Sequence, residues 1–143
     1  MTDYTLVVGL DKKHLEQLSY TWPTWKKHKP GLLKQPMVAF YDKYQINEPQ
    51  IRLVVDHPDL RCYPWPAGDP AIYDSQVDDK WNKPQRYKML AGFVHVPALM
   101  VETEYWLKLD TDTVAVGEPD WIDGSWFEDH PAIVSHPWGF TKP

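Results

Sequence analysis

Four short apolar runs constrain the fold of this chain more than any other feature of its sequence. They cover residues 5–10 (TLVVGL), 37–41 (MVAFY), 51–55 (IRLVV) and 105–109 (YWLKL), and they are rich in β-branched and aromatic residues. The first three runs predict strands that are buried on both faces, and the run at residues 105–109 is predicted to be a strand. Strands of this kind occur in parallel sheets whose faces are covered by helices.

A helical pattern follows the first predicted strand. Asp11 is placed to cap a helix in which Leu15, Leu18 and Trp22 fall on one face. Pro23 is expected to end this helix, because proline removes a backbone donor and clashes with the preceding turn. The opening segment is therefore predicted to be a strand followed by a helix.

Proline marks the remaining irregular segments. The chain has 14 prolines among 143 residues, which is about twice the average usage. Residues 60–79 combine Pro, Gly and Asp without periodicity and are predicted to form a long irregular loop. Asn82 is expected to cap a further helix with Pro84 in its first turn, and residues 132–135 form a last strand-like piece. Alternating strands and helices predict one α/β domain over residues 1–143, with a mostly parallel, Rossmann-like sheet flanked by helices.

Charge and composition exclude several classes of protein. The 15 Lys and Arg residues are outnumbered by 20 Asp and Glu residues, which gives a net charge of -5, and only Lys26, Lys27 and Lys29 cluster. Nucleic acid is therefore not expected as a partner. No apolar run approaches the roughly 20 residues that span a membrane, and no secretory leader is visible, so a cytoplasmic protein without a transmembrane segment is expected. Cys62 is the single cysteine and predicts neither an internal disulfide nor a zinc site.

Three of the predicted strands run directly into an aspartate, namely Asp11, Asp42 and Asp110. Because the carboxyl ends of parallel strands meet at one edge of a sheet, these residues predict a single polar rim where ligands collect. Asp110 and Asp112 are two residues apart, so their carboxylates can turn toward one point and share Mg²⁺ or Mn²⁺. The alternative is that both carboxylates accept hydrogen bonds from amides of their own turn.

The segment 106–113 (WLKLDTDT) resembles the nucleotide-sugar-dependent glycosyltransferases of the GT-A fold, which carry an Asp-x-Asp motif after a core strand. The opening TLVVGLDKKHLEQL, the MVAFYD strand and a helix carrying Arg86 and Lys88 ahead of the motif strand support the resemblance. It is specific over residues 83–116 and loose over the rest of the chain.

The resemblance implies that Asp110 and Asp112 bind a divalent metal, Mn²⁺ or Mg²⁺, which holds the diphosphate of a nucleotide-diphospho-sugar donor and stabilises charge on the leaving group. Asp112 is implied to be the closer ligand, and Asp110 to reach hydroxyls of the ribose or sugar as well. Arg86 or Lys88 is implied to pair with the diphosphate or with Asp110, against the alternative of an ordinary surface ion pair.

Three further residues have implied roles in this resemblance. Asp11 and Asp42 are expected to contact the nucleoside, although a helix cap explains Asp11 equally well. His136, after the last predicted strand, is a candidate third metal ligand, against the alternative of an ordinary packed or surface histidine.

The chain departs from the family in its length after the motif. Only 31 residues follow Asp112, whereas family members usually continue into a half that binds the acceptor and supplies the catalytic base of inverting members. We therefore expect a fragment, a truncated homologue, or a donor-binding module completed by a partner chain. The acceptor, the catalytic residues and the retaining or inverting outcome stay undetermined.

Two other functions are compatible with the sequence. The string LDTDTV is similar to the first motif of haloacid-dehalogenase-like phosphatases, in which Asp110 would be the phosphorylated nucleophile and Asp112 the acid/base. That motif opens its fold and requires later strands, which argues against it here. The second alternative is a non-catalytic module that binds sugar or nucleotide on aromatic surfaces. Its candidate stacking residues are Trp65, Trp81, Trp126 and Trp138.

Overall fold

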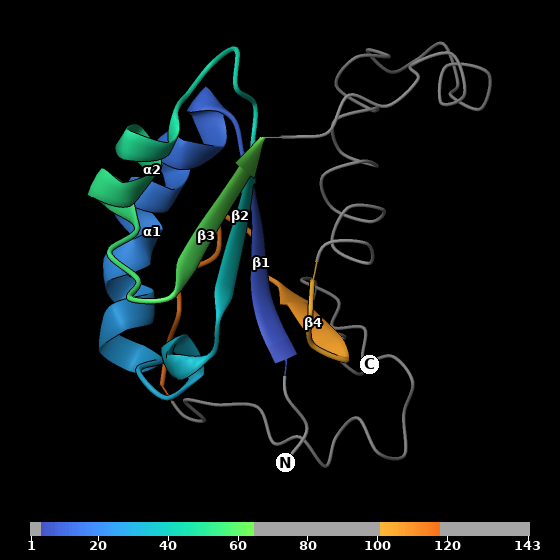
Figure 1. Cartoon of the computed structure of the whole chain (residues 1–143). Coiled ribbons are helices and arrows are strands. Elements are labelled where there is room, and N and C mark those ends of the chain that lie inside the picture. Colours follow the sequence, from blue (N-terminus) through green and yellow to red (C-terminus); the bar gives the residue numbers. More distant parts are fainter. Residues whose placement is uncertain (1–3, 65–100, 118–143) are drawn as a thin grey trace, which may run out of the picture.

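A computed structural model of the chain describes residues 4–64 and 101–117, which form a parallel four-stranded sheet with two α-helices on one face (Figure 1). The elements in chain order are β1 (Tyr4–Leu10), α1 (Lys12–His28), a 3-10 turn (Leu32–Lys34), β2 (Met37–Tyr41), α2 (Glu48–Val54), β3 (Leu60–Pro64) and β4 (Tyr105–Lys108). The strand order is β3-β2-β1-β4, and every neighbouring pair is parallel. The expected α/β fold with a parallel sheet is therefore confirmed for the described residues.

β1 lies inside the sheet, as its apolar sequence predicted. Its last five residues pair with all of β2, from Leu6 opposite Met37 to Leu10 opposite Tyr41. Its first four residues pair with β4 on the other edge, and Val7 lies opposite Lys108. Side chains of β1 point alternately to the two faces, so the strand contributes to a core under the helices and to a second cluster on the opposite face.

Helix α1 begins where the sequence predicted and continues beyond the predicted end. Asp11 caps it, and Leu15, Leu18 and Trp22 are buried against the sheet as expected. The prediction that Pro23 ends the helix is wrong, because α1 continues to His28. Side-chain contacts of the following two turns with residues 113–117 stabilise the continuation and offset the backbone hydrogen bond that proline removes. Within the described residues, no helix has the length and apolarity needed to cross a membrane.

The apolar run at residues 51–55 is helical, so the prediction of a strand there is wrong. Asn47 and Gln50 form a reciprocal capping box in which each side chain accepts from the other residue's backbone N–H at 3.0 Å. Ile51 and Val55 are one helical turn apart and are buried, whereas Leu53 between them is 87% exposed. The cap starts the helix, and burial of every fourth residue then favours it over a strand.

The prediction of a long irregular loop over residues 60–79 is also wrong for residues 60–64. Leu60–Pro64 is β3, which pairs with β2 along its whole length. Pro64 is tolerated because it ends a strand at the edge of the described sheet. The rest of that loop, the helix expected from Asn82 and the strand expected at residues 132–135 lie outside the described residues.

Substitutions in α2 distinguish the helix from the strand that the sequence suggested. Ile51→Ala should lower the free energy of unfolding by about 2–5 kcal/mol because it leaves a cavity in the core, whereas Leu53→Ala should change it by less than about 0.5 kcal/mol. Urea denaturation measures both. A strand would place residues 51, 53 and 55 on one face, so similar losses for the two variants would contradict the helix.

Candidate functional site

Asp110 and Asp112 follow β4 directly and lie in a turn in which Asp110 O accepts from the backbone N and the Oγ1 of Thr113, at the start of a segment that crosses to α1. Leu109 N still donates to Val7 O at 2.8 Å, and the chain then leaves the sheet and runs along α1 toward its C-terminal end (Figure 1). We call residues 110–117 the DTD strap. The strap connects the edge of the sheet to one flank of α1.

Side chains of the DTD strap alternate between α1 and solvent. Thr111 and Ala115 are buried, whereas Asp110 and Asp112 are exposed. Both aspartates are therefore exposed on either side of a buried Thr111, and a cation shared by their carboxylates stays a prediction.

Thr111, the residue between the two aspartates, is held by α1 from two directions. Its Oγ1 donates to Gln17 Oε1 at 2.9 Å, and its carbonyl accepts from Thr21 Oγ1 at 2.8 Å. Thr111 is only 5% exposed, so these contacts are shielded from water. The conformation of the motif thus depends on a helix about ninety residues earlier in the chain.

Further contacts hold the rest of the strap to α1. Trp25 Nε1 donates to Thr113 O at 3.0 Å, and Thr24 Oγ1 accepts from Ala115 N at 3.0 Å. Lys29 Nζ donates to the carbonyls of residues 116 and 117 at 3.0 and 2.6 Å. The strap is therefore fixed along its whole length, which makes the carboxylate pair a built feature of the fold.

The two carboxylates have different surroundings. Asp110 Oδ1 forms an ion pair with Lys108 Nζ at 3.0 Å, and both side chains are more than one third exposed, so the pair contributes little to stability. Within the described residues, no hydrogen bond or ion pair engages the carboxylate of Asp112. It does not bond amides of its own turn and remains available to a ligand.

The chemistry of the pair suits a hard cation, with other ligands required. Carboxylate oxygens are preferred by Mg²⁺ and Mn²⁺. Residues 4–64 and 101–117 contain no group of three or more His, Cys, Asp or Glu side chains able to hold a metal. A cation bound by Asp110 and Asp112 would therefore complete its shell with water or substrate oxygens, as Mg²⁺ commonly does.

Asp11 lies at the carboxyl end of β1 and caps α1. Its Oδ1 accepts from His14 N at 2.8 Å and lies 2.7 Å from His14 Nδ1. The helix-cap explanation therefore holds, and a nucleoside contact through this carboxylate stays a prediction.

Asp42 lies at the carboxyl end of β2 and is 3% exposed. Its two oxygens accept from Tyr44 N at 3.0 Å and from Gln45 Nε2 at 2.9 Å. Gln45 Oε1 in turn accepts from Lys12 N at 3.2 Å, which ties Asp42 to the first turn of α1 beside Asp11. Hydrogen bonds through Gln45 thus connect the predicted rim residues Asp11 and Asp42 at the ends of β1 and β2. β4 ends opposite Val7, so it leaves the sheet several residues before the position of Asp11.

Several predicted site residues cannot be compared with the structure. Arg86, Lys88 and His136 lie outside the described residues, as do Trp65, Trp81, Trp126 and Trp138. Cys62 lies in β3, where burial raises the pKa of its thiol.

Gln17 and Thr21 were not recognised from the sequence. They are four residues apart and so share one flank of α1. Polar residues at that spacing usually face water, and nothing local indicates that a distant segment binds them. Only the pairing of β4 with β1 brings Thr111 to this flank.

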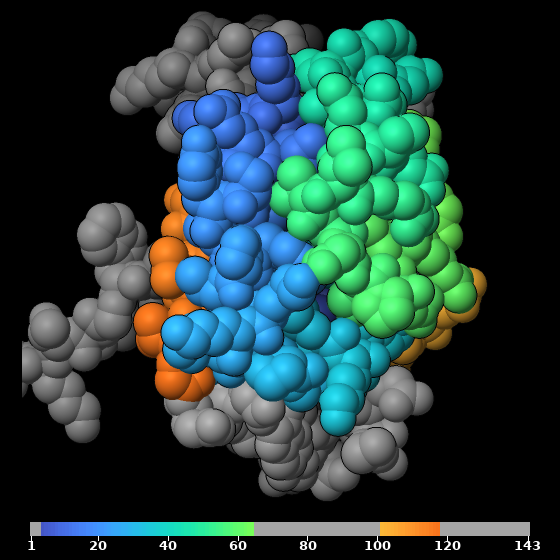
Figure 2. All heavy atoms as spheres, turned by 90° about the vertical axis from the view of Figure 1, so that its left-hand side faces the viewer, coloured from blue at the N-terminus to red at the C-terminus, as the bar shows by residue number. Residues whose placement is uncertain are grey.

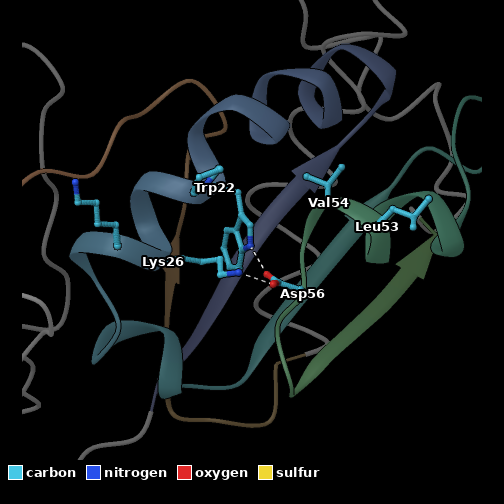
Figure 3. Close-up of a pocket in the computed structure, with 7 residues that line it drawn as sticks. Trp22, Lys26, Leu53, Val54 and Asp56 are labelled. Atoms are coloured by element: carbon cyan, nitrogen blue, oxygen red, sulfur yellow. Dashed lines mark hydrogen bonds and ion pairs between the residues drawn. The ribbon is translucent and has the colours of Figure 1, made fainter.

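A second feature lies on the other flank of α1. Figure 2 shows α1 between the DTD strap and α2, and an open groove of about 510 Å³ lies along the α2 side. Trp22 Nε1 donates to Asp56 Oδ1 at 2.8 Å, and Lys26 Nζ lies 2.5 Å from Asp56 Oδ2 (Figure 3). The groove is lined by Trp22, Pro23, Lys26, Lys27, Leu53, Val54 and Asp56. Its acidic group is already paired, and the groove is separate from the carboxylate pair.

No protein-family model, curated protein or solved structure matches this chain. The functional assignment therefore depends on the strand order and on the geometry of the DTD strap.

The Asp56 contacts predict a small pH dependence of stability. The hydrogen bonds from Lys26 and Trp22 hold the pKa of Asp56 below its ordinary value. A lowered pKa stabilises the fold above the unfolded value of about 3.9, and this contribution is lost as the pH falls through the folded value. Asp56→Asn should therefore lower stability at pH 7 by less than about 1 kcal/mol, because the pair is exposed.

Urea unfolding at pH 7, 5 and 3, chosen as about the range in which a carboxyl titrates, measures this effect. The difference between wild type and Asp56→Asn should shrink at the lowest pH. The control is Asp59→Asn, an exposed acid nearby that should change stability by less than about 0.5 kcal/mol. A difference that is constant with pH would contradict the assigned ion pair.

Proposed function

We propose that this chain binds a nucleotide-diphospho-sugar through a divalent metal held by Asp110 and Asp112, as the donor-binding part of a glycosyltransferase of GT-A type. One observation carries the proposal. Two exposed carboxylates flank a buried Thr111 that α1 holds, in the turn directly after β4. This is the position that an Asp-x-Asp motif occupies in the family that the sequence resembles.

The strand order supports a ligand site near this motif. β1, β2 and β3 follow one another in one direction across the sheet, whereas β4 pairs with the opposite edge of β1. In open parallel sheets, ligands bind beyond the carboxyl ends of the strands where the order reverses. The reversal lies between β1 and β4, and Asp110 follows β4.

Within the proposal, the two aspartates have different roles. Asp112 is the first metal ligand because its carboxylate is not otherwise engaged in the described residues. Asp110 is the second and exchanges its exposed ion pair with Lys108 for the cation, leaving the lysine near the donor phosphates. The metal, Mn²⁺ or Mg²⁺, supplies positive charge that stabilises the leaving diphosphate.

The rim residues and the residues outside the described part keep secondary places in the proposal. Asp11 and Asp42 already accept local hydrogen bonds, so a nucleoside contact would have to share their oxygens. Either Arg86 or Lys88 is proposed to pair with the donor phosphates. His136 is proposed as a third metal ligand. The same proposal includes an acceptor molecule and a partner chain that completes the site.

The two alternatives receive no specific support from the described residues. A haloacid-dehalogenase-like phosphatase carries its motif on the first strand of the fold, whereas β4 here follows three described strands in chain order. An aromatic binding module would depend on tryptophans outside the described part. Each alternative predicts a dependence on metal that differs from that of the proposed function.

Calorimetric titration of the whole chain with UDP, GDP and CMP, with and without Mn²⁺, tests the proposed function. One nucleotide should bind in a Mn²⁺-dependent manner, and Asp112→Asn should weaken that binding by more than about tenfold because a metal ligand is lost. Asp59→Asn is the matched control and should bind as the wild type does.

Other outcomes would assign the chain differently. Failure of the folded wild-type protein to bind any nucleotide with metal would contradict the donor site. Binding that is independent of metal would favour the aromatic module, and a phosphorylated Asp110 would favour the phosphatase.

A further inference from the structure

We infer that Gln17 and Thr21 of α1 are positioning residues for the metal-binding pair. They hold Thr111, the residue between Asp110 and Asp112, and thereby set the direction in which both carboxylates point. This inference rests on the proposed function and adds a role for two residues far from the motif in sequence.

The geometry of Thr111 carries the inference. Its side-chain hydroxyl donates to Gln17 Oε1 at 2.9 Å, while its carbonyl accepts from Thr21 Oγ1 at 2.8 Å. These two bonds fix both the side chain and the backbone of the same residue. Thr111 lies within the turn over residues 110–113, so fixing its backbone and side chain fixes the turn from which the exposed Asp110 and Asp112 project.

Burial gives these bonds their effect. Thr21 and Thr111 are both buried, so a lost hydrogen bond leaves a polar group without water to replace the partner. Two neighbouring carboxylates repel each other before a cation binds. A backbone held in place beforehand keeps the pair ready for the cation, so less ordering has to occur on binding.

Thr24 separates positioning from a general stabilising role. Its hydroxyl also bonds the DTD strap, but it accepts from Ala115 N at 3.0 Å, beyond both aspartates. Thr24→Val therefore removes a hydrogen bond between the same helix and the same strap, together with the bond that Thr24 Oγ1 donates to Thr21 O at 2.6 Å, without touching Thr111. Thr21→Ser keeps the hydroxyl and provides the conservative variant.

The experiment compares Thr21→Val, Thr21→Ser, Thr24→Val and Gln17→Met in the whole chain. Electron paramagnetic resonance of free Mn²⁺ measures metal binding, calorimetry measures binding of UDP, GDP and CMP with Mn²⁺, and urea denaturation measures stability. Thr21→Val and Gln17→Met should each weaken Mn²⁺ binding by about tenfold or more, as expected for residues that orient metal ligands. Thr21→Ser should restore it, and Thr24→Val should lose stability while binding Mn²⁺ as the wild type does.

The outcomes separate this inference from the proposed function. If Thr21→Val bound Mn²⁺ with the same affinity as the wild-type protein, the positioning role would be overturned and the donor site would stay intact. An equal loss in Thr21→Val and Thr24→Val would overturn it as well, because it would reflect general destabilisation. Absence of Mn²⁺ and nucleotide binding in the folded wild-type protein would overturn the proposed function and this inference together.

Discussion

β1 pairs with β2 on one edge and with β4 on the other, and all of its residues are buried, so its backbone hydrogen bonds are made largely to neighbouring strands rather than to water. Its full pairing with β2 sets one side of the sheet, and its shorter pairing with β4 sets the other. Because β4 ends opposite Val7, the chain leaves the sheet there and meets α1 partway along the helix. The place of the Asp-x-Asp motif therefore follows from the register at the central strand.

α1 contacts three parts of the described structure. One stripe packs on the sheet through Leu15, Leu18 and Trp22. A second flank holds the DTD strap through hydroxyl, amide and indole groups, and a third meets the Asp56 region beside the open groove. The acidic pair is thus supported by a rigid helix, which is what a site with oriented carboxylates requires.

Local patterns in the sequence predicted the structure correctly where the spacing of apolar residues matched the residues that are buried. Strands β1, β2 and β4, the cap at Asp11 and the apolar face of α1 were all predicted correctly. The run at residues 51–55 was misread because a short apolar run does not distinguish a strand from a buried helix, and the capping box decided the outcome. β3 was missed because the sequence around it is rich in proline and does not indicate a strand. Its pairing with β2 is what makes it one.

The sequence by itself determined the class of fold and the chemistry available after β4, because continuous apolar runs require a buried sheet and Asp110 and Asp112 supply two carboxylates just beyond a strand. Only the tertiary structure decided that Gln17 and Thr21 hold the residue between them. These partners are about ninety residues apart in the chain, and their hydrogen bonds form only once β4 has paired with β1. Local sequence preferences carry no information about such a contact, since the same threonine on an isolated helix would simply face water.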